Sequence, residues 1–171
     1  MSTFGFSSNA VQLGGLAVFA ISTVVCARTA AQGRRAWRSV AWLQLACFSE
    51  VLFGLRHHLH DAGGGLLRQM ARYNTRHDLQ VSLLVVLIIC TVLVAAWLWH
   101  TWRQRADATA PLFVAFAASG FSVLSFSAEV VSLHSVDAWL YAPFSIFNVI
   151  SLLWAAAAAT VCVGAVIEAR R

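Results

Sequence analysis

Charged residues are scarce in this 171-residue chain, and lysine is absent altogether. Charged residues make up 11% of the chain and hydrophobic residues 60%, and the mean hydropathy is +0.73. An average soluble domain carries about 25% charged residues. The shortage of charge therefore excludes an ordinary soluble domain and predicts an integral membrane protein.

Several catalytic motifs are missing as well. The sequence contains no Walker loop, HExxH, GxSxG or CxxC, so P-loop chemistry, zincin proteolysis and thiol–disulfide exchange lack support. The isolated cysteines Cys26, Cys47, Cys90 and Cys162 are expected to be small buried hydrophobic residues. No basic region precedes the first apolar run, and the first arginine of the chain, Arg28, follows that run. We therefore expect that run to remain as a span rather than to be a cleaved signal peptide.

Five apolar stretches take up most of the chain, and each is close to the roughly 20 residues that a helix needs to cross a bilayer. Helices satisfy their own backbone hydrogen bonds in lipid. The stretches cover residues 11–27, 39–58, 79–100, 112–131 and 144–167. The sequence thus predicts an all-α, polytopic membrane bundle that spans residues 1–171. We expect five transmembrane helices, or four if the short first stretch lies at the interface.

The distribution of arginine predicts the orientation, because basic residues concentrate in cytoplasmic loops. Eight arginines fall on one side of the predicted spans and four on the other. The eight are Arg28, Arg34, Arg35, Arg38, Arg103, Arg105, Arg170 and Arg171. This predicts an external N-terminus and a cytoplasmic C-terminus. The small size and exclusive use of arginine point to a bacterial inner membrane, where these side chains meet lipid headgroups rather than nucleic acid.

Glu50 lies inside the second apolar stretch. An ionisable residue within a span is costly and marks a functional site by default, although a structural hydrogen bond to another helix is the alternative. At 3.6 residues per turn, His57 and Asp61 return to within roughly 20° of Glu50. We therefore expect one helical face to carry all three residues, and glycines 63–65 to end the helix.

The histidine-rich end of this stretch fits more than one chemistry. The i,i+4 spacing of His57 and Asp61 suits two ligands of a divalent ion such as zinc, copper or iron. A proton relay is an alternative, and so is an interfacial helix tip with hydrated histidines. Haem is less favoured, because the histidines crowd at helix ends instead of facing one another within helices.

Residues 66–78 contain arginine at every fourth position. Arg68, Arg72 and Arg76 alternate with apolar residues, a pattern typical of a short amphipathic helix in the membrane interface. Its arginines would hold lipid phosphates, or form an anion clamp above a site. We expect membrane lipids to be partners of this segment.

The fourth stretch carries a second polar stripe. Ser119, Ser122, Ser125, Glu129 and Ser132 recur every three or four residues, and serines at this spacing let helices approach and bond across. His134 and Asp137 follow, and the fifth stretch opens with Ser145, Asn148 and Ser151. These polar faces are expected to meet the Glu50 face in one outward-opening cleft. At the other membrane surface, Trp97, Trp99 and Trp102 predict an aromatic belt.

Three functions follow from these patterns. The first is a membrane module with an outward-facing metal site, in a redox or hydrolytic assembly; its ligands would be Glu50, His57, Asp61, Glu129, His134 and Asp137. The second is a non-catalytic accessory subunit of a larger membrane complex, which would pack against other subunits or form a homo-oligomer. The third is a small lipid hydrolase using His134, Asp137 and Ser132.

Overall fold

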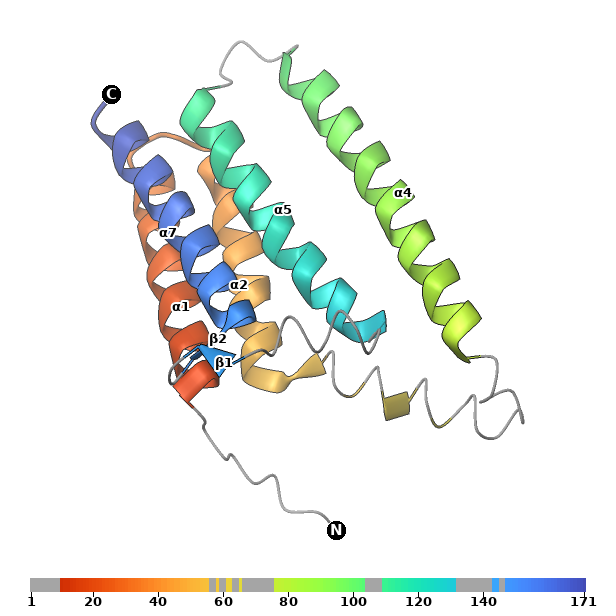
Figure 1. The fold of residues 1–171 in the computed structure, drawn as a ribbon. Coiled ribbons are helices and arrows are strands. Elements are labelled where there is room, and N and C mark those ends of the chain that lie inside the picture. The colour runs from red at the N-terminus through yellow and green to blue at the C-terminus, as the bar shows by residue number, and fades with distance from the viewer. Residues whose placement is uncertain are drawn as a thin grey trace.

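The residues that the structure describes form five long helices that run back and forth along one direction (Figure 1). The computed structural model describes residues 10–55, 58, 61–62, 65, 76–103, 109–131, 143–144 and 147–171. The helices are α1 (Ala10–Ala31), α2 (Trp37–Phe53), α4 (Arg76–Arg103), α5 (Ala110–Val131) and α7 (Val149–Ala169). Strand β1 (Pro143–Phe144) pairs antiparallel with β2 (Phe147–Asn148) just before α7.

Three of these helices, α1, α5 and α7, are long and apolar enough to cross a membrane. This confirms a helical membrane protein. Length and hydropathy do not support the predicted count of five spans: α2 has 17 residues, and the apolar run within α4 covers Gln80–Leu93 among the described residues. The predicted interfacial helix at 66–78 lies mostly outside the described residues.

The second helix ends earlier than its apolar stretch predicts. Gly54 closes α2 with φ 61° and ψ 38°, and its N–H donates to the carbonyl of Glu50 at 2.7 Å. This left-handed conformation is cheap for glycine and is a common helix terminator. A regular helix from Glu50 to Asp61 was therefore a wrong prediction, and the angular argument that placed His57 and Asp61 on the Glu50 face does not hold across Gly54.

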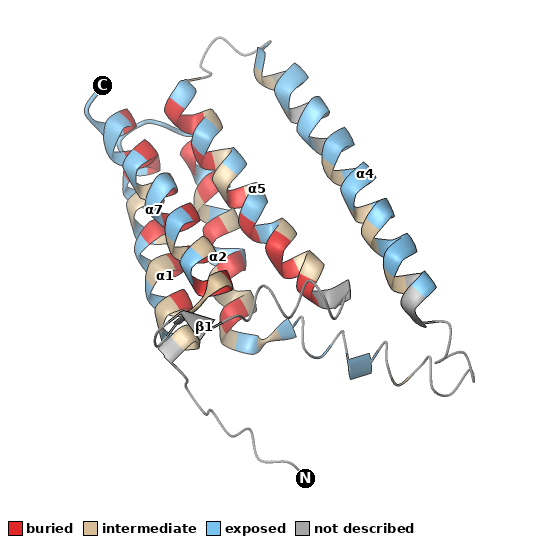
Figure 2. Ribbon diagram, in the orientation of Figure 1, coloured by how far each residue is buried: buried red, intermediate tan, exposed pale blue. Residues whose placement is uncertain are grey.

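Four helices, α1, α2, α5 and α7, form the core of the bundle, and their buried faces turn inward (Figure 2). Toward one end, the rings of Phe19, Phe126 and Trp154 meet with centroids 5.1–6.3 Å apart. Toward the other end, small and aliphatic side chains pack around Trp37. We call this second end the arginine end, since the exposed Arg28, Arg34, Arg35 and Arg38 lie at the α1–α2 connection there.

The fifth predicted stretch starts later as a helix than the sequence indicates. Residues 143–144 are in a strand, and α7 begins at Val149 after the N-cap Asn148. The Asn148 side chain accepts from the Ser151 N–H at 3.1 Å, and the Ser151 hydroxyl accepts from the Asn148 N–H at 3.3 Å. Asn148 and Ser151 thus form a capping box instead of a polar helical face.

Helix α4 stands apart from the four-helix core (Figure 1). It packs mainly on α5, through Trp99 and Trp102 against Phe113, with ring centroids 5.2 and 4.8 Å from Phe113. These rings lie near the arginine end, as expected for an aromatic belt. Much of the remaining α4 surface is exposed and apolar, and Cys90 is exposed there against the expectation of burial.

The α5–α7 contact depends on one glycine. A Cβ atom at Gly164 would stand 3.0 Å from the Pro111 carbonyl oxygen and 3.4 Å from the Trp37 ring. Pro111 is tolerated here because it occupies the first turn of α5, where its missing N–H has no helical partner. Gly164 therefore allows the backbones to approach closely, as small residues do in membrane helix pairs.

We expect Gly164→Ala to destabilise the bundle by about 1–3 kcal/mol, the usual cost of overpacking. Gly120→Ala is the matched control, because a Cβ atom at Gly120 meets nothing within 4 Å and alanine favours helix. Thermal unfolding of both variants in the same detergent measures the difference. Equal melting temperatures for the two variants would contradict the close α5–α7 packing.

Candidate functional site

A buried glutamine ties three helices together near the middle of the bundle. Gln44 of α2 is fully buried; its Oε1 accepts from the Ser22 hydroxyl of α1 at 2.7 Å, and its Nε2 donates to the Ser119 hydroxyl of α5 at 2.8 Å. We call Ser22, Gln44 and Ser119 the Gln44 clasp. A buried amide needs such partners, because an unsatisfied polar group in an apolar medium is costly.

The serine stripe of α5 continues from the clasp away from the arginine end. The Ser125 hydroxyl accepts from the indole N–H of Trp154 at 3.3 Å, which links α5 to α7. Ser122 is buried and donates to the Ala118 carbonyl of its own helix at 3.3 Å. The prediction that these serines bond between helices is therefore confirmed for Ser119 and Ser125.

Two acidic residues lie beyond the clasp, at the end of the bundle opposite the arginine end. Glu129 of α5 is buried, with 6% of its surface exposed, and Glu50 of α2 is half-buried. Helices α2 and α5 run in the same direction (Figure 1). At 1.5 Å per residue, Glu50 is about 9 Å beyond Gln44, and Glu129 about 15 Å beyond Ser119. The two carboxyl-bearing residues thus differ in height by roughly 6 Å.

The structure places only part of the predicted metal site. Glu50 and Glu129 belong to helices that share one core cluster, in which Cys47 and Val51 of α2 join Phe126 of α5. Asp61 is exposed and lies past the Gly54 break. His57, His134 and Asp137 lie outside the described residues, as do Arg68, Arg72 and the side chain of Arg76. Within the part of the chain that the structure describes, no group of three His, Cys, Asp or Glu residues could hold a metal ion.

A further buried acid, which the sequence analysis did not predict, lies at the arginine end. Glu168 of α7 is 3% exposed; its Oε2 accepts from the Thr109 hydroxyl at 2.7 Å, and its Oε1 lies 3.7 Å from Nε of Arg34. It thereby joins the end of α7 to the α1–α2 connection and to the start of α5. The arginines of the α1–α2 connection are a signal in the sequence that could have suggested this pairing.

An apolar layer separates the two polar regions of the bundle. Between the Gln44 clasp and Glu168 lie Cys26, Val40, Ala115 and Val161, all buried. The described side chains therefore offer no continuous line of polar groups from one end to the other.

Comparisons with protein-family models, with curated proteins and with solved structures find no match for this chain.

We expect Gln44→Leu to lower stability by roughly 1 kcal/mol, because two interhelical bonds of about 0.6 kcal/mol each disappear. The cost is limited, since the Ser22 and Ser119 hydroxyls keep acceptors at the carbonyls of Phe19 and Ala115. A double-mutant cycle with Ser119→Ala, followed by unfolding in detergent, isolates the contact. Strictly additive effects of Gln44→Leu and Ser119→Ala would contradict the clasp.

Proposed function

We propose that this protein is a membrane module that binds a divalent cation at the face opposite its arginine end. The observation that carries this proposal is the burial of Glu129 on α5, next to the helix that bears Glu50. A carboxylate buried in a membrane bundle is costly unless a cation, a proton or a donor compensates its charge. Glu50 and Glu129 lie at the same end of the bundle. Their carboxylates would supply hard oxygen ligands to a cation that enters from that membrane surface.

The remaining ligands in this proposal come from the segments that follow α2 and α5. Those segments carry Asp61, His57, His134 and Asp137, and they follow helix ends that lie at the Glu50–Glu129 end of the bundle. Imidazole together with carboxylate suits zinc, copper or iron. If the arginine end is cytoplasmic, as the positive-inside rule predicts, the site faces the periplasm of a bacterial inner membrane. Such a metal would serve a redox or hydrolytic assembly.

Five membrane crossings form part of this proposal. Helix α2 packs on α1 along the core and, at 17 residues, is about 26 Å long, slightly less than the hydrocarbon thickness of about 30 Å. Helix α4 has 28 residues and runs antiparallel to α5 (Figure 1). Helices α1, α5 and α7 qualify as spans, and in this proposal α2 and α4, which lie between them in the chain, cross the same layer.

The metal proposal predicts a specific pattern of metal loss. The full chain, purified in mild detergent without chelator, is expected to hold zinc, copper or iron near one ion per chain by elemental analysis. Glu129→Gln and His134→Ala should lose most of it, while Asp78→Asn, which removes an exposed acid at the start of α4, should keep it. A metal-free wild-type chain, or equal retention in all the variants, would refute the proposal.

A second candidate function, an accessory subunit of a larger membrane complex, is favoured by helix α4. Val86, Ile89 and Leu93 are each more than half exposed and lie on one face at spacings of three and four residues. Because α4 is fixed to the core mainly through its aromatic residues near the arginine end, this face is free to pack against another subunit.

Isolation of the tagged chain from its native membrane tests the second function. A stoichiometric partner should be lost when Val86, Ile89 and Leu93 are changed together to alanine. It should remain when the equally exposed Leu13, Ile21 and Val24 of α1 are changed in the same way. Loss of the partner in both triple variants, or the absence of any stoichiometric partner, would count against a docking role for α4.

A further inference from the structure

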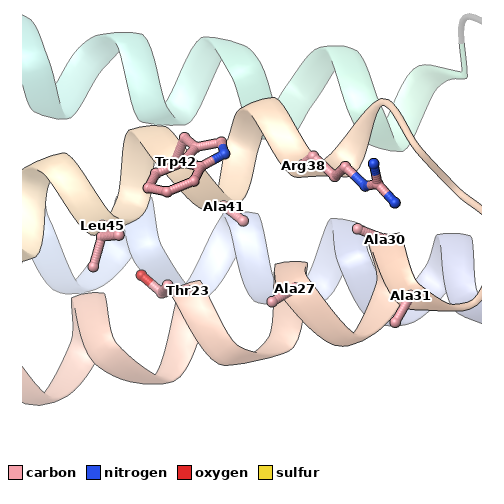
Figure 3. A pocket seen from close by; sticks show the side chains of 8 residues that line it. All are labelled: Thr23, Ala27, Ala30, Ala31, Arg38, Ala41, Trp42 and Leu45. Atoms are coloured by element: carbon pink, nitrogen blue, oxygen red, sulfur yellow. The ribbon is translucent and has the colours of Figure 1, made fainter.

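A groove of about 350 Å³ runs between α1 and α2 on the outer surface of the bundle (Figure 3). Alanines 27, 30, 31 and 41 form much of its floor, and their small size leaves the space open. Arg38 stands at one end of the groove and Leu45 toward the other, with Trp42 between them on the same helix. The groove is separate from the Glu50–Glu129 region and begins at the opposite end of the bundle.

The order of these residues matches the profile of one membrane leaflet. Arg38 is the second residue of α2 and therefore lies at the membrane surface of the arginine end. At 1.5 Å per residue, Trp42 lies about 6 Å deeper and Leu45 about 10 Å deeper. Tryptophan favours the level just below the headgroups, where its ring is apolar and its N–H is polar. Along the groove, the cationic Arg38 is therefore followed by the ring of Trp42 at the interface and then by the aliphatic Leu45 deeper in the membrane.

The interior of the groove is apolar. Its one hydroxyl, on Thr23, already donates to the Phe19 carbonyl at 2.7 Å. Trp42 is 70% exposed and rises as a wall above the alanines. A single extended hydrocarbon chain is thin enough to lie along the groove.

Charge complementarity favours an anionic occupant at the open end. Among the described residues, Arg34 is paired with Glu168, whereas Arg38 is exposed and has no acidic partner. The exposed Arg28 and Arg35 add to the positive potential at the same surface. A guanidinium binds a phosphate through parallel N–H donors, and the headgroup of an anionic phospholipid lies at this depth.

We propose that the α1–α2 groove binds one anionic phospholipid from the leaflet at the arginine end. Arg38 holds the phosphate, Trp42 covers the glycerol region, and one acyl chain follows the alanine floor toward Leu45. The lipid fills the space between the two helices next to the Gln44 clasp. This inference is independent of the metal proposal, because none of its residues contributes to that site.

Native mass spectrometry of the full chain tests the groove, with phosphatidylglycerol, phosphatidylethanolamine and inorganic phosphate as separate probes. We expect phosphatidylglycerol to bind preferentially. Arg38→Gln should weaken that binding roughly fivefold, as expected for loss of one basic residue near a charged surface, and Ala27→Leu should weaken it by filling the groove. The controls are Arg35→Gln and Ala17→Leu, which change exposed residues outside the groove.

The variant that removes charge and the variant that fills the groove together distinguish a specific lipid site from nonspecific attraction of anionic lipid to the basic surface. Weakening by both Arg38→Gln and Ala27→Leu, with Ala17→Leu unchanged and Arg35→Gln weakening binding less than Arg38→Gln does, supports the proposal. Equal binding of the two lipids, or equal binding of free phosphate, would overturn it. Loss of binding in Arg38→Gln without loss in Ala27→Leu would also overturn it, since only surface charge would then matter. Circular dichroism and gel filtration establish that each variant keeps its fold, and Ala27→Val replaces Ala27→Leu if the larger side chain prevents folding.

Discussion

The bundle depends on the need to satisfy polar side chains where water is absent. Gln44 meets this need by bonding to Ser22 on α1 and Ser119 on α5 at 2.7 and 2.8 Å. Because apolar side chains gain little from leaving lipid for one another, such bonds and close backbone packing select how membrane helices associate. The hydrogen bond between Gln44 and Ser119 fixes the position of α2 relative to α5 along the axis of the bundle. The aromatic cluster around Trp154 and the close contact at Gly164 then fix α7.

The two ends of the bundle use their charged residues differently. At the arginine end, Glu168 pairs with Arg34 and accepts a hydrogen bond from Thr109. The neighbouring Arg38 is exposed beside an apolar groove. At the opposite end, Glu129 is drawn into the bundle and Glu50 is half-buried. The cation proposed at one end and the anionic lipid proposed at the other rest on the same rule, since an opposite charge stabilises a charged group in a low-dielectric setting.

Hydropathy was enough to predict a helical membrane bundle and the rough positions of its helices, because apolar length is a direct consequence of bilayer thickness. It could not locate helix ends set by local geometry, as at Gly54 and Asn148. The serine stripe predicted interhelical contacts, and Ser119 and Ser125 make them. Gln44 and Glu168 were missed as anchors, because their importance comes from residues on other helices: Ser22 and Ser119 for Gln44, and Arg34 for Glu168. A helical wheel of one segment does not contain that information.

Hydrogen exchange of the Gln44 side-chain amide, followed by NMR with the protein in lipid nanodiscs, tests the central contact most directly. The exposed Gln32, in the connection between α1 and α2, serves as the internal reference. The clasp predicts slow exchange for the Gln44 Nε2 protons, together with through-space contacts to the Ser22 and Ser119 side chains. Exchange as fast as that of Gln32, without those contacts, would contradict the arrangement of α1, α2 and α5 described above.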